Sequence, residues 1–183
     1  MKKLLMVVDP QIDFINGSLP IGGAPEAMDE LAKYIAAHNG EYAYKIVTAD
    51  WHPYRHCSFK DNGGVWPLHC VAHTTGAALW PALVNPLYTT AGPVKVLHKG
   101  VYADREEYSI FQNLKSAAFI ADIVQIMGIE QIDICGLAGD VCVLETLKDG
   151  IARYGKQKFR VLKEFSPSLD RGKALDAFLQ EMG

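Results

Sequence analysis

Cys142 is the residue whose surroundings most clearly suggest chemistry. It comes after an apolar run that breaks at Gly136-Leu137-Ala138-Gly139, and the chain then restarts at Asp140 with the pattern of a helix. A cysteine in the first turn of a helix lies beside unpaired backbone N–H groups, whose partial positive charge lowers the pKa of a thiol. The same groups can bind an oxyanion that forms on a substrate carbonyl. We therefore expect Cys142 to act as a nucleophile.

Two charged residues provide what a cysteine nucleophile needs. Asp9 follows the apolar run 3–8, and Lys99 follows the run 94–98. A carboxylate can accept the thiol proton and later give it to a leaving amine, and an ammonium favours the thiolate. Taken singly, a strand-terminal aspartate, a surface lysine and a small buried cysteine are the ordinary interpretations. Together, Asp9, Lys99 and Cys142 indicate acyl transfer.

A second group of residues has the composition of a metal site. Asp50 and His52 alternate on a chain that reads as extended, so they face one side, and His56 and His69 follow within the next loop. One carboxylate and three imidazoles suit a divalent metal, with Zn²⁺ favoured and Fe²⁺ or Mn²⁺ also suitable. If such a metal held the substrate rather than activating water, it would orient a ring nitrogen or polarise the substrate. The competing interpretation is a set of solvated loop histidines.

Alternating strands and helices position these residues. We predict strands over 3–8, 43–49, 94–98, 132–135 and 159–162, and helices over 24–39, 116–127, from 140 onward and over 171–182. Residues 53–90 have no long periodic pattern and are predicted to form a functional loop region. This order predicts an α/β three-layer sandwich with a mostly parallel central sheet, in which ligands bind beyond the carboxyl ends of the strands. Asp9, Asp50, Lys99 and Cys142 should therefore meet at one edge.

Composition limits the partners of the chain. With 183 residues, of which 49% are hydrophobic, residues 1–183 fit one domain. A net charge of −3 with scattered Lys and Arg gives no general reason to bind nucleic acid or an anionic membrane. The apolar run 4–8 is too short for a signal-peptide core or a membrane span, which favours a cytoplasmic protein with four free cysteines. We expect a small-molecule partner, and formation of a homo-oligomer stays open.

Five segments together resemble the nicotinamidase branch of the isochorismatase-like cysteine hydrolases. They occur in matching order over most of the chain: VVDPQIDF (7–14), DWHPYRHCSF (50–59), WPLHC (66–70), HKG (98–100) and GLAGDVCV (136–143). The resemblance implies an isochorismatase-like fold, a catalytic triad of Asp9, Lys99 and Cys142, and metal binding by Asp50, His52, His56 and His69. It also implies hydrolysis of nicotinamide to nicotinate and ammonia through a cysteine thioester, in NAD salvage, with the pyridine nitrogen on the metal.

The resemblance implies further features around the nucleophile. The Leu137–Ala138 peptide should be cis, and the N–H groups of Ala138 and Cys142 should form the oxyanion hole. Phe14, Trp66 and Tyr108 should hold the substrate ring, with Tyr108 resting on the least clear alignment. Gly139 and Val141 replace larger residues that are frequent in the family, which implies a wider pocket beside the nucleophile.

Two other functions fit part of these observations. An amidase of the same family could act on another small amide, such as a carbamoyl or ureido compound, and would need no aromatic residues around its substrate. A non-catalytic metal-binding or scaffold protein would need no nucleophile, and the presence of Asp9, Lys99 and Cys142 together argues against it.

Overall fold

The protein is an α/β structure built on one parallel sheet, as the sequence predicted. The computed structural model describes residues 1–182. Five strands pair in the order β3-β2-β1-β4-β5, and every pairing is parallel. The strands are β1 (Lys3–Val8), β2 (Tyr42–Asp50), β3 (Val94–Lys99), β4 (Gln131–Gly136) and β5 (Phe159–Val161). The α-helices are α1 (Ile12–Ile15), α2 (Ala24–Ala37), α3 (Pro81–Thr89), α4 (Leu114–Ile126), α5 (Leu144–Tyr154) and α6 (Lys173–Met182).

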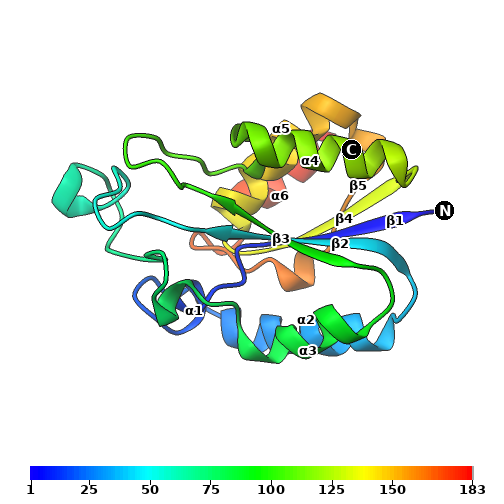
Figure 1. Cartoon of the computed structure of the whole chain (residues 1–183), viewed down its shortest axis with the longest axis horizontal. Helices are drawn as coiled ribbons and strands as arrows, with labels where there is room; N and C mark the ends of the chain where they lie inside the picture. The colour runs from blue at the N-terminus through cyan, green and yellow to red at the C-terminus, as the bar shows by residue number, and fades with distance from the viewer. Residues whose placement is uncertain (183) are drawn as a thin grey trace.

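Helices cover both faces of the sheet, which gives three layers. Helices α2 and α3 lie on one face, and α4, α5 and α6 lie on the other (Figure 1). Strand β1 shows why, because its side chains alternate between two separate apolar cores. Leu5 packs in the core that contains Met28 of α2, and Met6 packs in the core that contains Leu147 of α5. A strand buried on both faces is apolar at nearly every position, as β1 is.

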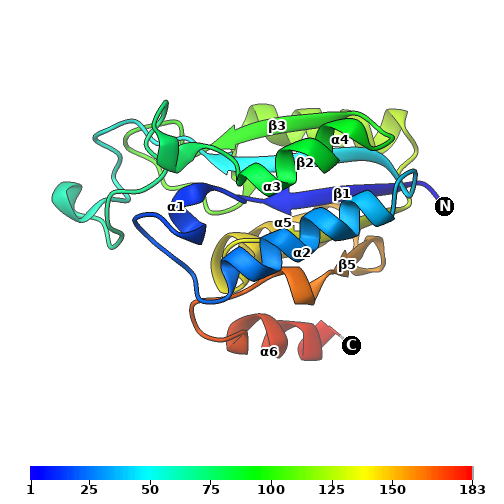
Figure 2. The ribbon, with the colours of Figure 1, turned by 90° about the horizontal axis from the view of Figure 1, so that it is seen from below.

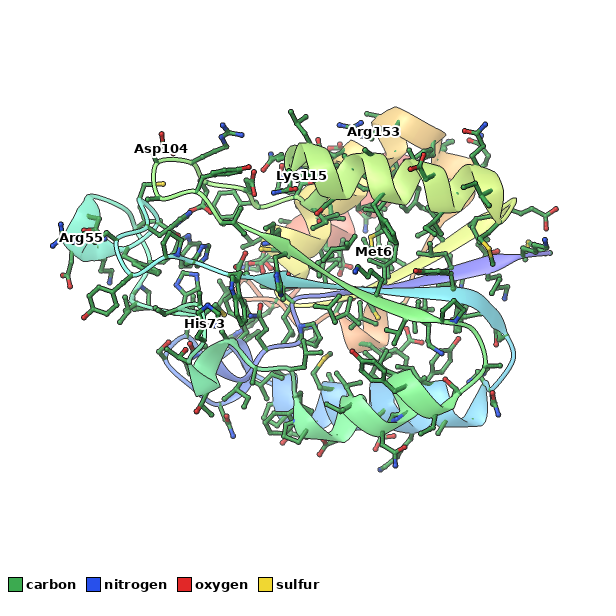
Figure 3. The ribbon with its side chains drawn as sticks, in the orientation of Figure 1. Met6, Arg55, His73, Asp104, Lys115 and Arg153 are labelled. Atoms are coloured by element: carbon green, nitrogen blue, oxygen red, sulfur yellow. The ribbon has the colours of Figure 1, made fainter. Side chains whose placement is uncertain are left out.

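The long loops gather beyond the carboxyl ends of the strands. In the view from below, these loops extend at the opposite end of the molecule from the N-terminus (Figure 2). Arg55, His73 and Asp104 mark this group of loops, well away from Met6 within the sheet (Figure 3). Because all strands run in the same direction, the residues that end them lie at this edge.

The structure differs from the predicted elements at α1, at α3 and at the start of α5. The short helix α1 occupies a segment where we predicted no helix. Helix α3 lies within residues 53–90, where we predicted only loop. Its prolines, Pro81 at the first position and Pro86 inside it, hide a helical pattern because proline usually interrupts helices. The predicted helix from Asp140 begins instead with a π-helical turn over Gly139–Val143, and α5 starts only at Leu144.

All four cysteines are free, as predicted. Among the described residues, none of the helices combines the length and apolar character that crossing a bilayer requires.

Candidate active site

Lys99 is the centre of a buried ionic group at the carboxyl edge of the sheet. Its Nζ lies 2.8 Å from Asp9 Oδ2 and 2.5 Å from Asp50 Oδ1, and it donates to Cys142 Sγ at 3.4 Å. The ammonium therefore forms an ion pair with Asp9 and hydrogen bonds with Asp50 and Cys142. Strand register explains part of this arrangement, because Asp50 and Lys99 are directly paired across β2 and β3. The structure thus brings together the three residues that the sequence predicted to act jointly.

The carboxylate of Asp9 is held by strand β2. Thr48 donates its hydroxyl to Asp9 Oδ1 at 2.6 Å, and the backbone N–H of Asp9 donates to the Thr48 carbonyl at 3.0 Å. Asp9 has a φ of +46°, in the left-handed region that non-glycine residues seldom adopt. Strain of this kind persists where surrounding contacts impose it, and it is concentrated at functional sites.

Burial sets the protonation of these groups. It raises the pKa of Cys142 well above its usual value, an effect that Lys99 opposes and the carboxylates of Asp9 and Asp50 reinforce. It likewise raises the pKa of Asp9, although Lys99 lowers it. Burial also disfavours the charged forms of Lys99 and Asp50. The attraction between these two charges outweighs that effect, so the pKa of Lys99 is raised and the pKa of Asp50 is lowered. The lowered thiol pKa that we predicted from the helix start is therefore outweighed.

The turn that carries Cys142 is unusual in its backbone. The Leu137–Ala138 peptide is cis, as the resemblance implied, and the Val143 N–H donates to the Ala138 carbonyl five residues earlier. Such π-turns occur frequently at functional sites. Ala138 and Cys142 both line the adjacent cavity, where their predicted oxyanion-hole N–H groups would be needed.

Gly139 does not widen this cavity. A Cβ at this position would lie 2.4 Å from both the Ser166 carbonyl oxygen and the Ser168 hydroxyl, so the glycine allows residues 166–168 to approach. The Gly139 N–H donates to the Pro167 carbonyl at 2.8 Å. Gly139 and Val141 are the two residues that replace larger ones of the family, and of these only Val141 lines the cavity.

Asp50, His52 and His69 form a buried group that fits a metal ion. Their ligand atoms lie within 4.8 Å of one another. His52 donates from Nδ1 to the Gly100 carbonyl at 3.0 Å, and His69 donates from Nδ1 to the Pro67 carbonyl at 2.7 Å. Each Nε2 is thereby left with its lone pair, which is the usual arrangement for metal-binding histidines.

The orphaned nitrogen of His52 supports this fit. Its Nε2 is buried without a hydrogen-bond partner among residues 1–182, and it lies 3.5 Å from Asp50 Oδ2. Two ligand atoms on one tetrahedral zinc ion, each at about 2.1 Å, lie roughly 3.4 Å apart. A carboxylate with two imidazoles also matches the donor set of Fe²⁺ sites that keep open positions.

His56 lies beside this group but is turned away from it. Its ring lies beside that of His52, with centroids 4.1 Å apart and the ring planes tilted by 30°. Its Nε2 donates to the Arg105 carbonyl at 2.9 Å, and its Nδ1 accepts from the Ser58 N–H at 3.1 Å. Both ring nitrogens are therefore engaged, so the structure does not place His56 with the other three predicted ligands. Spacing alone could not show this, because the orientation of the ring depends on the loop at Arg105.

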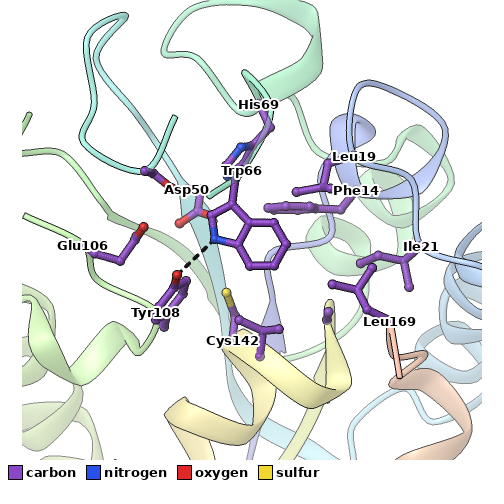
Figure 4. Close-up of a pocket in the computed structure, with 13 residues that line it drawn as sticks. Phe14, Leu19, Ile21, Asp50, Trp66, His69, Glu106, Tyr108, Cys142 and Leu169 are labelled. Carbon is purple, nitrogen blue, oxygen red and sulfur yellow. Dashed lines mark hydrogen bonds between the residues drawn. The ribbon is translucent and has the colours of Figure 1, made fainter. Parts of the chain in front are cut away.

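A mostly apolar cavity of about 380 Å³, including its open mouth, lies directly above Cys142 (Figure 4). The three predicted ring-binding residues all line it, and Trp66 donates from Nε1 to the Tyr108 hydroxyl at 3.0 Å. Asp50 and His69 lie on one side of the cavity, so the nucleophile and the metal group open into the same space (Figure 4). Aromatic walls of this kind suit a flat ligand.

The sequence did not single out several residues of the site. Gln11 is buried and forms two hydrogen bonds with the backbone of Asp50. Its Nε2 donates to the Asp50 carbonyl and its Oε1 accepts from the Asp50 N–H, both at 2.8 Å. Its place two residues after Asp9 was the only signal. The remaining lining residues come from distant loops and carry no local motif: Leu19, Ile21, Ser58, Glu106 and Leu169.

The chain belongs to the isochorismatase family. The isochorismatase domain matches residues 3–157. Among curated relatives, the nicotinamidase/pyrazinamidase of Mycobacterium tuberculosis is 30% identical over 154 residues, which is 81% of this chain and 78% of the relative. The nicotinamidase of Saccharomyces cerevisiae is 31% identical over 138 residues, which is 61% of this chain, and the match spans 63% of the yeast protein's length.

Solved structures share the complete fold. PnC1 from L. infantum in complex with nicotinate is 30% identical with a TM-score of 0.82, covering 99% of this chain and 88% of that protein. The pyrazinamidase of Pyrococcus horikoshii in complex with zinc is 28% identical with a TM-score of 0.78, covering 98% of this chain and 96% of the other. The isochorismatase-like fold that the sequence predicted is confirmed.

Proposed function

We propose that the protein is a metal-dependent amidase that hydrolyses nicotinamide to nicotinate and ammonia in NAD salvage. The observation that carries this proposal is the contact of Lys99 with Asp9, Asp50 and Cys142 at the base of a cavity lined by aromatic residues. Relatives of about 30% identity that are named nicotinamidases, and the nicotinate complex of a similar structure, support the choice of substrate.

In the first half of the reaction, Cys142 Sγ attacks the amide carbonyl carbon. Because burial raises the pKa of this thiol, its proton must leave as the sulfur attacks, and Asp9 is the carboxylate placed to accept it. A carboxyl whose own pKa is raised by burial then returns this proton to the amide nitrogen. The C–N bond breaks, ammonia leaves, and the acyl group stays on sulfur as a thioester.

In the second half, water attacks the thioester carbonyl. Asp9 takes a proton from this water and returns it to sulfur as the C–S bond breaks, which gives the carboxylic acid and the Cys142 thiol. Lys99 keeps the carboxylate and the sulfur in place throughout. The backbone N–H groups of Ala138 and Cys142 would stabilise the oxyanion in both halves. A divalent metal held by Asp50, His52 and His69 would bind the pyridine nitrogen and orient the ring.

Ammonia release by the purified protein tests this function. We expect hydrolysis of nicotinamide and of pyrazinamide, which also has a ring nitrogen, and much slower hydrolysis of benzamide, which has none. Equal rates with benzamide would contradict the role of the ring nitrogen. Metal analysis of the same sample should find about one zinc, iron or manganese ion per chain.

The second candidate is an amidase of the same family for another small amide. It is favoured if acetamide or an N-carbamoyl amino acid is hydrolysed faster than nicotinamide. The cavity argues against it, because Phe14, Trp66 and Tyr108 would present aromatic faces to a substrate without a ring.

Removing a metal ligand should weaken metal binding before it affects folding. We expect His52→Ala and His69→Ala to lower zinc affinity by more than about 100-fold, since even indirect partners of a ligand contribute 10- to 100-fold. His56→Ala is the matched control and should keep zinc affinity within about threefold of that of the unmodified protein, because both His56 nitrogens bond to backbone groups. Competition with a chromogenic chelator measures all three. A large loss of zinc affinity in His56→Ala would show that His56 is also a metal ligand.

Leu169 should set how tightly the ring is held. It lines the cavity while remaining 43% exposed, and its backbone N–H donates to Asp140 Oδ1 at 3.0 Å. Leu169→Ala removes apolar contact worth about 1 kcal/mol, so KM for nicotinamide should rise about fivefold with kcat nearly unchanged. Leu114→Ala truncates an exposed leucine that does not line the cavity and should change neither constant. A fall in kcat with constant KM would contradict this role.

A further inference from the structure

Glu107 is a fully buried carboxylate that the reaction described above does not use. It has 0% exposure and lies in the loop between β3 and α4. Its Oε2 accepts from the Gly100 N–H at 2.8 Å and from the Asn113 side-chain amide at 3.3 Å, and Oε1 has no hydrogen-bond partner within residues 1–182. Both donors are neutral amides. Since burying a carboxylate is costly, its presence here calls for a specific role.

Gly100 links Glu107 to the candidate metal group. Its N–H donates to Glu107, and its carbonyl accepts from His52 Nδ1 at 3.0 Å. It also directly follows Lys99 at the end of β3. Its φ is +62°, and a Cβ there would lie 2.4 Å from His52 Cε1, so only glycine allows this approach. The backbone at Gly100 is thus held from one side by a carboxylate and touches an imidazole on the other.

We propose that Glu107 is a positioning residue that, by holding the Gly100 backbone, keeps His52 oriented with Nε2 toward Asp50 and His69. The hydrogen bond at Nδ1 decides which nitrogen carries the proton and therefore which one can bind a metal. If Gly100 shifts, the carbonyl that fixes this choice shifts with it. The inference rests on the metal site of the proposed function. It adds that Glu107, which is not itself a proposed ligand, fixes the orientation of the ligand His52.

The test compares zinc affinity among variants by chelator competition. Glu107→Ala should bind zinc 10- to 100-fold more weakly, the range found when an outer partner of a metal ligand is lost. Glu107→Gln keeps an oxygen acceptor for Gly100 and should restore affinity to within about threefold of that of the unmodified protein. Glu107→Met removes the acceptor at similar volume without leaving a cavity, so it provides the same measurement if the alanine variant unfolds.

Asp133→Asn is the matched control. Asp133 is also 0% exposed and accepts two hydrogen bonds from neutral groups, Tyr42 and Gln131, but it lies within β4, away from the ligand group. The Asp133→Asn variant should unfold at a lower urea concentration but bind zinc with unchanged affinity. A change in zinc affinity equal to that of Glu107→Ala would show that any loss of a buried carboxylate has this effect, and would overturn the inference.

A measurement on the unmodified protein completes the test. Imidazole ¹⁵N spectra of the metal-free protein, recorded at a pH at which the His52 ring is neutral, should show its proton on Nδ1, and Glu107→Met should lose this preference. The opposite tautomer in the unmodified protein, or parental zinc affinity in folded Glu107→Met, overturns the role of Glu107. If the unmodified protein itself binds no zinc, iron or manganese, the metal site of the proposed function fails instead, and the ¹⁵N result still decides the effect of Glu107 on His52.

Discussion

Cys142→Ala is expected to lower nicotinamide hydrolysis by at least about 10⁴-fold while leaving nicotinamide binding nearly intact. The sulfur is the only proposed nucleophile, and loss of a nucleophile that acts together with its base removes most of the catalysis. The alanine keeps the backbone N–H and leaves the aromatic walls of the cavity unchanged. Ammonia release measures the first effect, and calorimetric titration with nicotinamide measures the second.

Cys135→Ala is the matched control for this prediction. Cys135 is a second buried cysteine in the preceding strand, packed in the core on the α2 and α3 face. Its loss should reduce stability slightly and change kcat by less than about twofold. Intact-protein mass spectrometry of the quenched reaction should detect a nicotinoyl adduct with Cys135→Ala and none with Cys142→Ala. Full activity in Cys142→Ala would instead indicate attack by water at the metal.

The convergence of Asp9, Asp50, Lys99 and Cys142 could be predicted from the sequence because it depends on few physical rules. Apolar runs marked the buried strands, and alternation with helices made the sheet parallel. In a parallel sheet the carboxyl ends lie at one edge, so residues that follow strands meet there. The register of Asp50 with Lys99 then follows from the pairing of β2 with β3.

Other features depend on contacts between distant loops, which no local pattern reveals. The orientation of His56, for example, is set by the Arg105 carbonyl of another loop. Leu169 comes from a segment outside the matched family region, which ends at residue 157. The thiol pKa of Cys142 also escaped prediction, because its direction results from burial and two carboxylates rather than from the helix start alone.

Lys99 connects the stability of the site with its chemistry. The buried carboxylates of Asp9 and Asp50 each place an oxygen within 4.8 Å of an oxygen of the other. They would repel each other without the positive charge of Lys99, which contacts both. The same charge keeps Asp50 ionised, as a metal ligand requires, while Asp9 keeps a raised pKa suited to proton transfer. Two neighbouring carboxylates therefore have different roles because burial and one ammonium act on them unequally.

Lys99→Met should accordingly abolish activity and lower the free energy of unfolding by about 3–5 kcal/mol at pH 7, the cost of leaving a buried charge without its partner. Urea unfolding of the metal-free protein measures this loss. Lys45→Met is the matched control, because Lys45 is equally buried but donates only to backbone carbonyls and the hydroxyl of Thr90. Its loss leaves no charge unpaired and should cost about 1–3 kcal/mol.

The pH dependence separates these two losses. Without Lys99, the pKa values of Asp9 and Asp50 in the folded protein should both rise above those in the unfolded chain, so the folded state binds more protons and gains stability as pH falls. The difference in unfolding free energy between Lys99→Met and the unmodified protein should therefore be smaller at pH 5 than at pH 7, whereas that of Lys45→Met should stay constant. A loss from Lys99→Met that does not change with pH would mean that repulsion between the carboxylates is not its cause, and that Lys99 stabilises the site mainly through packing of its side chain.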